Sequence, residues 1–340
     1  MTRRHVCRRG SPIWGFLRRR LLQTVPVVFG IALLNFLILQ IAPGDVVDVM
    51  AGEAGAATPE YMAQMRASFG LDQPLGLQLL HYLWRMFTLD LGFSFRQNMP
   101  VFDLVMDRLP ATLLLMTSAI FIALLLGVAL GTLSAIKVHS WVDNLGSLFV
   151  LAAYAMPTFW LGLMAIVLFS ARLGWLPSGG MTDISANHQG LAWVLDVARH
   201  AVLPSFTLAT FYLAVYAKLV RSSMLELYGA DFIRTARAKG AGETRIALVH
   251  TLRNALLPLV TMLGFQIASL LSGAVLVESV FSWPGLGRLA FEAILARDFN
   301  LLLGILLLSS ILVTLINIGV DLLYAWLDPR VQLTTTGAHA

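Results

Sequence analysis

Few residue patterns in this 340-residue sequence could carry out covalent chemistry. Its seven histidines include no pair spaced i, i+4, so the helical zinc site of many metalloproteases is absent. Its three lysines, Lys137, Lys218 and Lys239, follow Ile or Ala, so there is no Gly-Lys-Ser/Thr phosphate loop. A single cysteine, Cys7, cannot build a disulfide framework or a cysteine-based zinc site. The sequence therefore predicts no enzyme activity, no bound cofactor and no metal in this chain.

Residues 231–240 suggest a docking surface for another protein. Asp231 is a favourable N-cap and Gly240 a favourable C-terminal stop, which predicts a helix of about two turns between them. Because so short a helix is unstable alone, we expect packing to hold it. The alternative interpretation is a basic loop without a docking role. The expected apolar side of the helix is Phe232, Ile233 and Ala236, and the basic side is Arg234, Arg237 and Lys239.

Long apolar segments must position this helix. Hydrophobic residues make up 58% of the sequence and charged residues 13%, whereas ordinary soluble domains are about 25% charged. In one apolar run, Gly127 and Gly131 are spaced for a close helix contact, either inside one bundle or across a dimer. Apolar runs of about 20 residues are long enough to cross a bilayer. We therefore predict an all-α integral membrane protein with six transmembrane helices, at 21–41, 111–136, 145–170, 201–220, 256–276 and 301–325.

The distribution of basic residues predicts the orientation in the membrane. If the N-terminus is cytoplasmic, 16 of the 24 Lys and Arg lie in cytoplasmic segments, as the positive-inside rule requires. The pI of about 9.7 then reflects orientation and contact with anionic lipid, and no nucleic-acid partner is expected. The first apolar run is a retained helix rather than a signal peptide, because no small-x-small cleavage pattern follows it. The predicted cytoplasmic segments are 1–20, 137–144, 218–255, which contains the loop 221–255, and 327–340, which contains the tail 328–340.

The segment 42–109 is the only external stretch long enough for a small domain, with helical runs at 59–69 and 77–86. It contains eight acids and four bases, which fits electrostatic docking of another protein and equally fits a solvated surface. The remaining residues, 110–327, would form the main transmembrane domain.

Charged residues are almost absent from the central turns of the predicted spans, and Asp321 lies near the end of the last one. Charges inside the membrane are expensive and usually mark ion or proton pathways. Their scarcity argues against an ion-coupled secondary carrier. That alternative stays open, since backbone carbonyls can bind sodium.

Ten short segments follow one another along nearly the whole chain. They are Pro-Gly-Asp at 43–45, Gly-Leu-Asp-Gln-Pro-Leu at 70–75, Asp-Leu-Gly-Phe-Ser at 90–94, Arg-Leu-Pro-Ala-Thr at 108–112, Met-Pro-Thr-Phe-Trp-Leu-Gly at 156–162, Leu-Pro-Ser-Gly at 176–179, Arg-Thr-Ala-Arg-Ala-Lys-Gly at 234–240, Leu-Arg-Asn-Ala-Leu-Leu-Pro at 252–258, Glu-Ser-Val-Phe-Ser-Trp-Pro-Gly-Leu-Gly at 278–287 and Leu-Asp-Pro-Arg at 327–330. In this order and spacing they resemble ABC importer permeases, specifically the branch that serves dipeptides, oligopeptides and nickel.

Two departures from the general importer motif narrow this resemblance. Arg234, Thr235 and Ala236 stand where the general motif has Glu-Ala-Ala, and Leu257-Pro258 falls five residues late. Both departures are similar to those of the peptide and nickel branch. Because Arg234 stands at the position of the motif's Glu, the role of that acid has no counterpart in this chain.

The resemblance implies a type I importer permease in a bacterial or archaeal cytoplasmic membrane. Its partners would be a second, similar permease, two ATPase subunits that bind ATP and Mg, and a periplasmic substrate-binding protein. The helix at 231–240 would dock in an ATPase and receive the motion driven by ATP. The residues expected to couple in this way are Asp231, Arg234, Thr235, Ala236, Lys239 and Gly240.

The segment 278–288 is a second candidate site, expected near the external mouth of the pathway. Its candidate residues are Glu278, Phe281, Trp283, Pro284 and Gly285. Phe281 and Trp283 could equally be anchors at the membrane–water interface, where aromatic residues are enriched.

Overall fold

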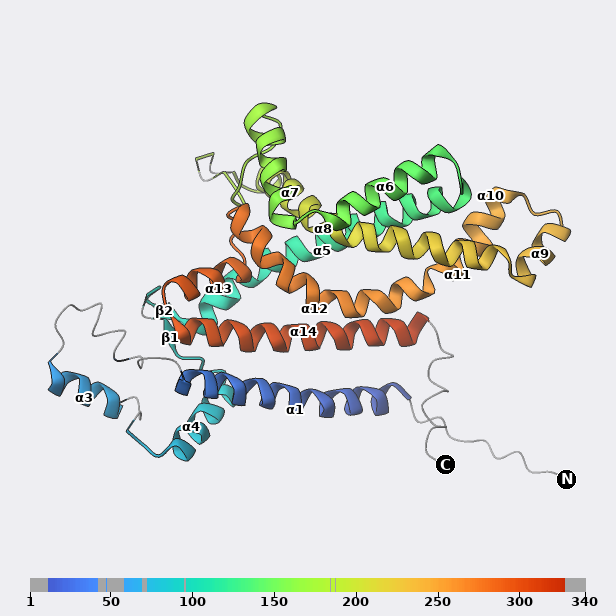
Figure 1. Cartoon of the computed structure of the whole chain (residues 1–340). Helices are drawn as coiled ribbons and strands as arrows, with labels where there is room; N and C mark the ends of the chain where they lie inside the picture. The colour runs from blue at the N-terminus through green and yellow to red at the C-terminus, as the bar shows by residue number, and fades with distance from the viewer. Residues whose placement is uncertain are drawn as a thin grey trace, which may run out of the picture. The chain divides into compact units, whose positions relative to one another are not determined.

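The computed structural model describes residues 12–41, 47, 58–68, 72–94, 96–183, 185, 186 and 188–327, and most of these residues are helical (Figure 1). They belong to two compact units. Unit 1 combines Met1–Asp103 with Ala296–Ala340, and unit 2 is Leu104–Leu295. Residues 1–11 of the predicted basic N-terminus, the predicted tail 328–340, and residues 42–46, 48–57 and 69–71 of the predicted external segment lie outside the described residues.

Unit 1 is organised around two long helices, α1 (Pro12–Ile41) and α14 (Phe299–Leu327), which pack against each other. The side-chain amide of Asn35 in α1 donates to the main-chain oxygen of Leu303 in α14, at 3.4 Å. A hairpin of β1 (Phe93–Ser94) and β2 (Met99–Pro100) is fixed to α14 by the Ser94 hydroxyl, which donates to Asp298 at 2.5 Å. Helices α3 (Pro59–Ser68) and α4 (Leu75–Phe87) lie where the sequence predicts helical runs.

The central helix of unit 2 is α8 (Leu191–Tyr228), which packs against α6 (Trp141–Ala155) and α12 (Leu257–Val280). It also lies close to α5 (Val101–Ile136) at two glycines. A Cβ atom at Gly131 would lie 2.5 Å from the carbonyl oxygen of Ala217 in α8, and one at Gly127 would lie 2.9 Å from the Cβ of Tyr216. The two glycines therefore allow a close helix contact inside one bundle, which is one of the two interpretations of their spacing.

The predicted transmembrane helix 145–170 is not continuous in the structure. It is divided into α6 and a second helical stretch, α7 (Thr158–Ala165) followed by the π-helical turn η1 (Ile166–Arg172), and the two stretches are bent by 106°. The break falls at Pro157, which has no N–H to donate, and at Met156, which is extended with ψ 130° as a residue before proline prefers. Hydropathy alone does not detect this bend.

Three of the described helices are long and apolar enough to cross a membrane: Val101–Ile136, Leu191–Tyr228 and Phe299–Val320. The bent pair would be a fourth span. The predicted span 21–41 lies within α1, whose apolar part is Thr24–Ile38. The predicted span 256–276 coincides with α12 except for its first residue, Leu256, which is the N-cap. The apolar helices of the fold class are thus present, and the count of six crossings stays a prediction.

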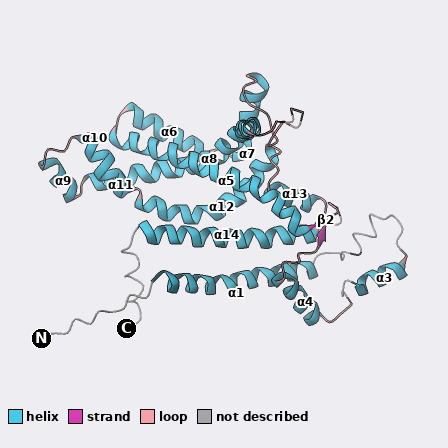
Figure 2. Ribbon diagram, turned by 180° about the vertical axis from the view of Figure 1, so that it is seen from behind, coloured by secondary structure: helices cyan, strands magenta, loops and turns pink. Residues whose placement is uncertain are grey.

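The remaining helices of unit 2 lie at its two ends. At one end α8 is followed by α9 (Asp231–Ala238), α10 (Glu243–Arg245), the π-helical turn η2 (Ile246–Thr251) and α11 (Leu252–Ala255). At the other end α12 is followed by α13 (Leu286–Leu295). Figures 1 and 2 show α9 and α13 at opposite ends of this unit.

Candidate functional site

Helix α9 begins at Asp231, one position earlier than predicted. Ala230 occupies the N-cap with extended backbone (φ −73°, ψ 149°) and caps with no side chain. Asp231 is therefore the first helical residue, and the N-cap prediction for it is wrong. An acid in the first turn still favours the helix through the helix dipole. Thr235 donates from its hydroxyl to the Asp231 carbonyl at 3.0 Å, and Arg234 lies 3.6 Å from the Asp231 carboxylate.

The C-terminal end of α9 is a Schellman motif at Gly240, as the sequence predicts. Gly240 has φ +81°, the left-handed region that glycine adopts at no steric cost. Its N–H donates to the Arg237 carbonyl at 3.0 Å, and the N–H of Ala241 donates to the Ala236 carbonyl at 3.1 Å. The helix therefore stops at a fixed point and the chain reverses there.

A bidentate ion pair spans this reversal of the chain. Arg237 donates from Nε and Nη2 to the two carboxylate oxygens of Glu243 at 2.8 and 3.1 Å. The guanidinium holds the pKa of Glu243 below its ordinary value, chiefly by these hydrogen bonds. The same contact raises the pKa of Arg237. Because both groups are exposed, the pair shapes the turn more than it stabilises the fold.

The apolar residues of α9 are partly buried and partly exposed. Ile233 is fully buried, and α9 packs through it against η2, where Ile246 is also fully buried. Ala236 is half-buried on the same side. Phe232 points elsewhere and is 42% exposed. Of the predicted coupling residues, those that share the exposed surface are Asp231, Arg234, Thr235, Lys239 and Gly240.

The buried part of α9 leads directly into the core of unit 2. Turn η2 contacts α8 and continues through α11 into α12, and α11 itself packs on α8. Residues 243–255 are thus helical throughout, and the π-helical turn within them is not revealed by the sequence pattern. Helix α9 is thus connected by packing to α8 and α12.

A second ion pair, which the sequence does not suggest, lies near the same end of unit 2. Arg221 of α8 donates from Nε and Nη2 to the carboxylate oxygens of Asp143 at 2.7 and 2.8 Å, and the main-chain N–H of His139 donates to the same carboxylate at 3.0 Å. Asp143 is buried, and it lies in the first turn of α6. The two residues are 78 positions apart, so no local pattern links them. The pair fastens the α5–α6 turn to α8, ten positions before α9 begins.

The segment 278–288 is built around a buried carboxylate. Glu278 is fully buried; its Oε1 accepts from the Thr112 hydroxyl at 2.7 Å and its Oε2 accepts from the Arg288 main-chain N–H at 3.0 Å. Thr112 in turn accepts from the N–H of Leu286 at 2.7 Å. Gly285 lies directly against this carboxylate, with no room for a Cβ atom.

The aromatic residues of this segment are buried as well. Trp283 is fully buried and donates from Nε1 to the Ala111 carbonyl at 2.9 Å, and the Phe281 carbonyl accepts from the N–H of Gly180 at 2.8 Å. Both side chains therefore belong to the core of unit 2 rather than to an exposed aromatic belt. Pro284 is half-buried. The place of the segment at the mouth of a pathway stays a prediction.

Taken with the apolar helices, these sites define a class of protein. It is a multi-pass membrane protein with an exposed short helix, α9, that ends at a fixed point, and its sequence has no phosphate loop. The chain belongs to the family of binding-protein-dependent transport system inner membrane components. The model of this family matches residues 127–333, and the model of its N-terminal region matches residues 13–116.

Curated relatives extend over almost the whole chain. The dipeptide transport system permease protein DppB of Escherichia coli K12 is 41% identical, with 93% of this chain and 98% of that protein covered. The di/tripeptide transport system permease protein DppB of Pseudomonas aeruginosa is 40% identical at the same coverage. A putative peptide transport system permease protein of Brucella abortus is 39% identical, with 92% of this chain and 98% of that protein covered.

A solved structure supports the fold. The inward-facing MetNI methionine ABC transporter matches with a TM-score of 0.53 at 20% identity, with 66% of this chain and 96% of that chain covered. The chain is therefore an inner membrane component of a binding-protein-dependent transport system, similar in sequence to dipeptide permeases and with the helical fold of an ABC importer permease.

Proposed function

We propose that this chain forms one half of the translocation pathway of an ATP-driven importer and receives its drive through α9. The observation that carries the proposal is the construction of α9: its end is fixed at Gly240, one side is buried against η2 through Ile233, and the other is open. The proposed partners are a second homologous permease, two ATPase subunits, a periplasmic binding protein and the surrounding lipid. Both termini would be cytoplasmic, so α9 would lie on the ATPase side.

Helix α9 would sit in a cleft of one ATPase, with Phe232 as an apolar anchor and Arg234 and Lys239 as charged contacts at its edge. Exposed aromatic side chains are common anchors in protein interfaces. Closure of the ATPases on ATP would move α9, and the packing of η2 and α11 would pass that motion to α8 and α12. This is a two-state device biased from a distant site. ATP and Mg would be bound by the partners alone.

The substrate class we propose is di- and oligopeptides, because the relatives with the same arrangement along the chain are named as peptide permeases. Nickel and glutathione are the alternative substrates. Mass spectrometry of the ligand held by the partner binding protein distinguishes them: a peptide supports the proposal, and a metal complex or glutathione contradicts the substrate class alone.

The coupling role is tested by two valine substitutions in the same turn. Gly240→Val forces a β-branched residue into the left-handed region, at a cost of roughly 1–2 kcal/mol in local strain, and is expected to abolish peptide uptake. Gly242→Val is the matched control, since Gly242 has φ −66° and, like Gly240, open space around it. Uptake and membrane insertion are measured for both variants in cells that express the complete transporter.

We expect normal insertion of both variants and loss of uptake in the Gly240 variant only. Normal uptake by the Gly240 variant would remove α9 from the mechanism. Co-purification from the native membrane then tests the partners separately, because an ion-coupled carrier would be recovered without ATPase subunits.

A further inference from the structure

Helix α4 presents an apolar stripe that nothing in the described part of the chain covers. The stripe consists of Leu77, Leu80, Trp84 and Phe87, all exposed, and Trp84 and Phe87 are 69% and 80% exposed. The spacing of three, four and three residues puts them within an arc of roughly 80° on the helix. Such a stripe on a soluble surface would be a liability.

The opposite side of α4 rests on the C-terminal part of α1. Tyr82 lies against Phe36 with ring centroids 5.8 Å apart, and the side-chain amide of Gln40 donates to that of Gln78 at 2.9 Å. The polar sector between the two sides is narrow and contains His81 and Arg85. Since α1 covers only half of the apolar circumference of α4, the other half needs a different environment.

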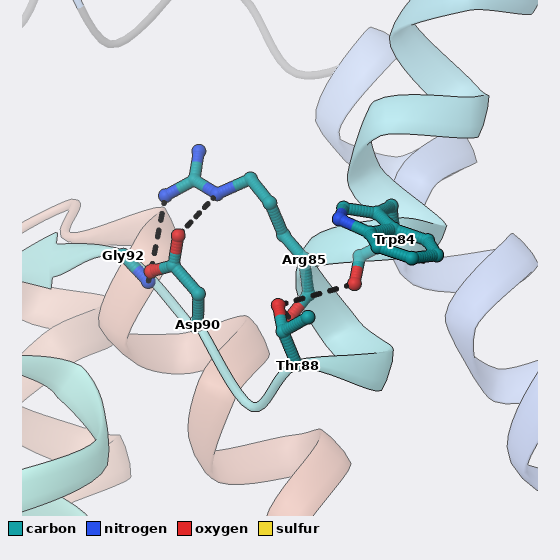
Figure 3. Close-up of polar contacts among 5 residues, drawn as sticks. All are labelled: Trp84, Arg85, Thr88, Asp90 and Gly92. Atoms are coloured by element: carbon teal, nitrogen blue, oxygen red, sulfur yellow. Dashed lines mark hydrogen bonds and ion pairs between the residues drawn. The ribbon is translucent and has the colours of Figure 1, made fainter.

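The C-terminal end of α4 is fixed by a set of local hydrogen bonds (Figure 3). Arg85 donates from Nε to Asp90 at 3.1 Å, and Asp90 also accepts from the N–H of Gly92 at 3.2 Å. The Thr88 hydroxyl donates to the carbonyls of Trp84 and Arg85. Leu89 adopts the left-handed region (φ 56°), and the N–H of Asp90 returns to the Arg85 carbonyl at 2.9 Å, which completes a Schellman end.

We propose that α4 is an interfacial anchor whose Leu77–Leu80–Trp84–Phe87 stripe lies in the boundary between lipid headgroups and acyl chains on the external side of the membrane. A 13-residue helix is too short to cross a bilayer but suits an interfacial position. Figures 1 and 2 show α4 running across α1 near the end of that helix, so if α1 spans the membrane then α4 lies along its surface.

Two further observations favour lipid over a protein as the occupant. The stripe carries no charge, and the nearest cation, Arg85, is paired within the chain to Asp90, which matches uncharged hydrocarbon rather than an acidic partner. In addition, α1, on which α4 packs, exposes apolar residues of its own, Leu34, Leu37 and Ile38. Trp is the residue type most typical of such a boundary. The inference rests on α1 being a membrane helix, which belongs to the proposed function.

Nitroxide labelling of the full-length chain in lipid nanodiscs tests the proposal. Cys7→Ser provides a cysteine-free background, into which Leu80→Cys, Trp84→Cys, the polar-side control His81→Cys and the membrane reference Leu34→Cys are introduced one at a time. Collision of the label with oxygen and with a water-soluble nickel chelate gives its depth. The labels at 80 and 84 are expected roughly 5–10 Å into the boundary, the label at 34 deeper, and the label at 81 in water. Discs of phosphatidylcholine alone and with phosphatidylglycerol are expected to give the same depths.

The outcomes separate this inference from the proposed function. Labels at 80 and 84 that collide freely with nickel, while 34 is in lipid, would overturn the anchor alone. Labels at 80 and 84 shielded from both reagents would show a protein cover instead of lipid and would also overturn it. A label at 34 that lies in water would contradict the membrane role of α1 itself.

Discussion

At the scale of single residues, Thr112 connects two residues of the segment 278–288, and no pattern in the sequence suggests this role. Its hydroxyl donates to the buried Glu278 carboxylate and accepts from the Leu286 N–H. A buried carboxylate whose described partners are a hydroxyl and main-chain N–H groups depends on every one of them, because each lost bond leaves a group unsatisfied in a medium of low dielectric.

Thr112→Val is expected to lower the free energy of unfolding by about 2–4 kcal/mol, since it orphans both an acceptor and a donor. Thr112→Ser keeps the hydroxyl and is the matched control. Denaturant unfolding of the two variants in the same detergent measures the difference. Equal stability of the serine and valine variants would mean that the hydroxyl contributes nothing.

The pair Arg237–Glu243 allows a prediction with a definite sign in pH. The pKa of Glu243 is lowered from 4.5 by Arg237, so the contribution of the pair is present above about pH 4.5 and is lost as the pH falls through the folded-state pKa. Carbon-13 NMR titration of glutamate-labelled protein should place the pKa of Glu243 below 4.5, and Arg237→Gln should return it to its ordinary range.

The same pair can be tested in transport at neutral pH. Arg237→Glu is expected to weaken peptide uptake because two carboxylates then repel across the Gly240 turn, and adding Glu243→Arg should restore part of it. If the double variant is no better than the single one, the contact between the two side chains does not shape the turn.

At the scale of elements, the Asp143–Arg221 pair holds the α5–α6 turn against α8, and we expect the two to move together during transport. Arg221→Lys removes the two-pronged geometry, and Asp143→Asn removes the charge; each costs about 1.5–3 kcal/mol for a hydrogen bond to a charged group. We expect both variants to retain ATP hydrolysis by the partner subunits but to lose much of the peptide uptake, because motion of α8 no longer carries α6.

Ser222→Ala is the control for this prediction, since Ser222 is exposed and its hydroxyl contacts only the Leu219 carbonyl among the described groups. Uptake and ATP hydrolysis are measured on the purified complex for all three variants. Undiminished uptake in both the Arg221 and the Asp143 variants would contradict a role in transmission.

The elements also show which parts of the structure local sequence reveals. Helix α9 was predictable because its stop, Gly240, and its packed residue, Ile233, lie within one short segment. The start was misjudged by one residue because Ala230 has the extended backbone of an N-cap without a capping side chain. Pro157 and Gly131 can be recognised in the sequence as residues that permit a bend and a close helix contact, but the sequence does not show what they pack against. Asp143 and Arg221 cannot be recognised as a pair, since they lie far apart in the sequence.

At the scale of the whole molecule, the structure connects an exposed helix to long apolar helices. Both compact units contain apolar helices, and α9 is connected through the packing of η2 and α11 to α8 and α12 within unit 2. Among the described residues no cluster of His, Cys, Asp and Glu suited to a metal ion is present. The sequence has no phosphate loop. Under the proposed function, work enters through contact of α9 with an ATPase subunit.

The most direct measurement of this claim is the initial rate of uptake of a labelled dipeptide into proteoliposomes. One set contains the complete complex with its binding protein and ATP on the ATPase side, and the other contains this chain alone under a proton or sodium gradient. We expect ATP-dependent uptake in the first set and none in the second. Gradient-driven uptake by the chain alone would contradict the account.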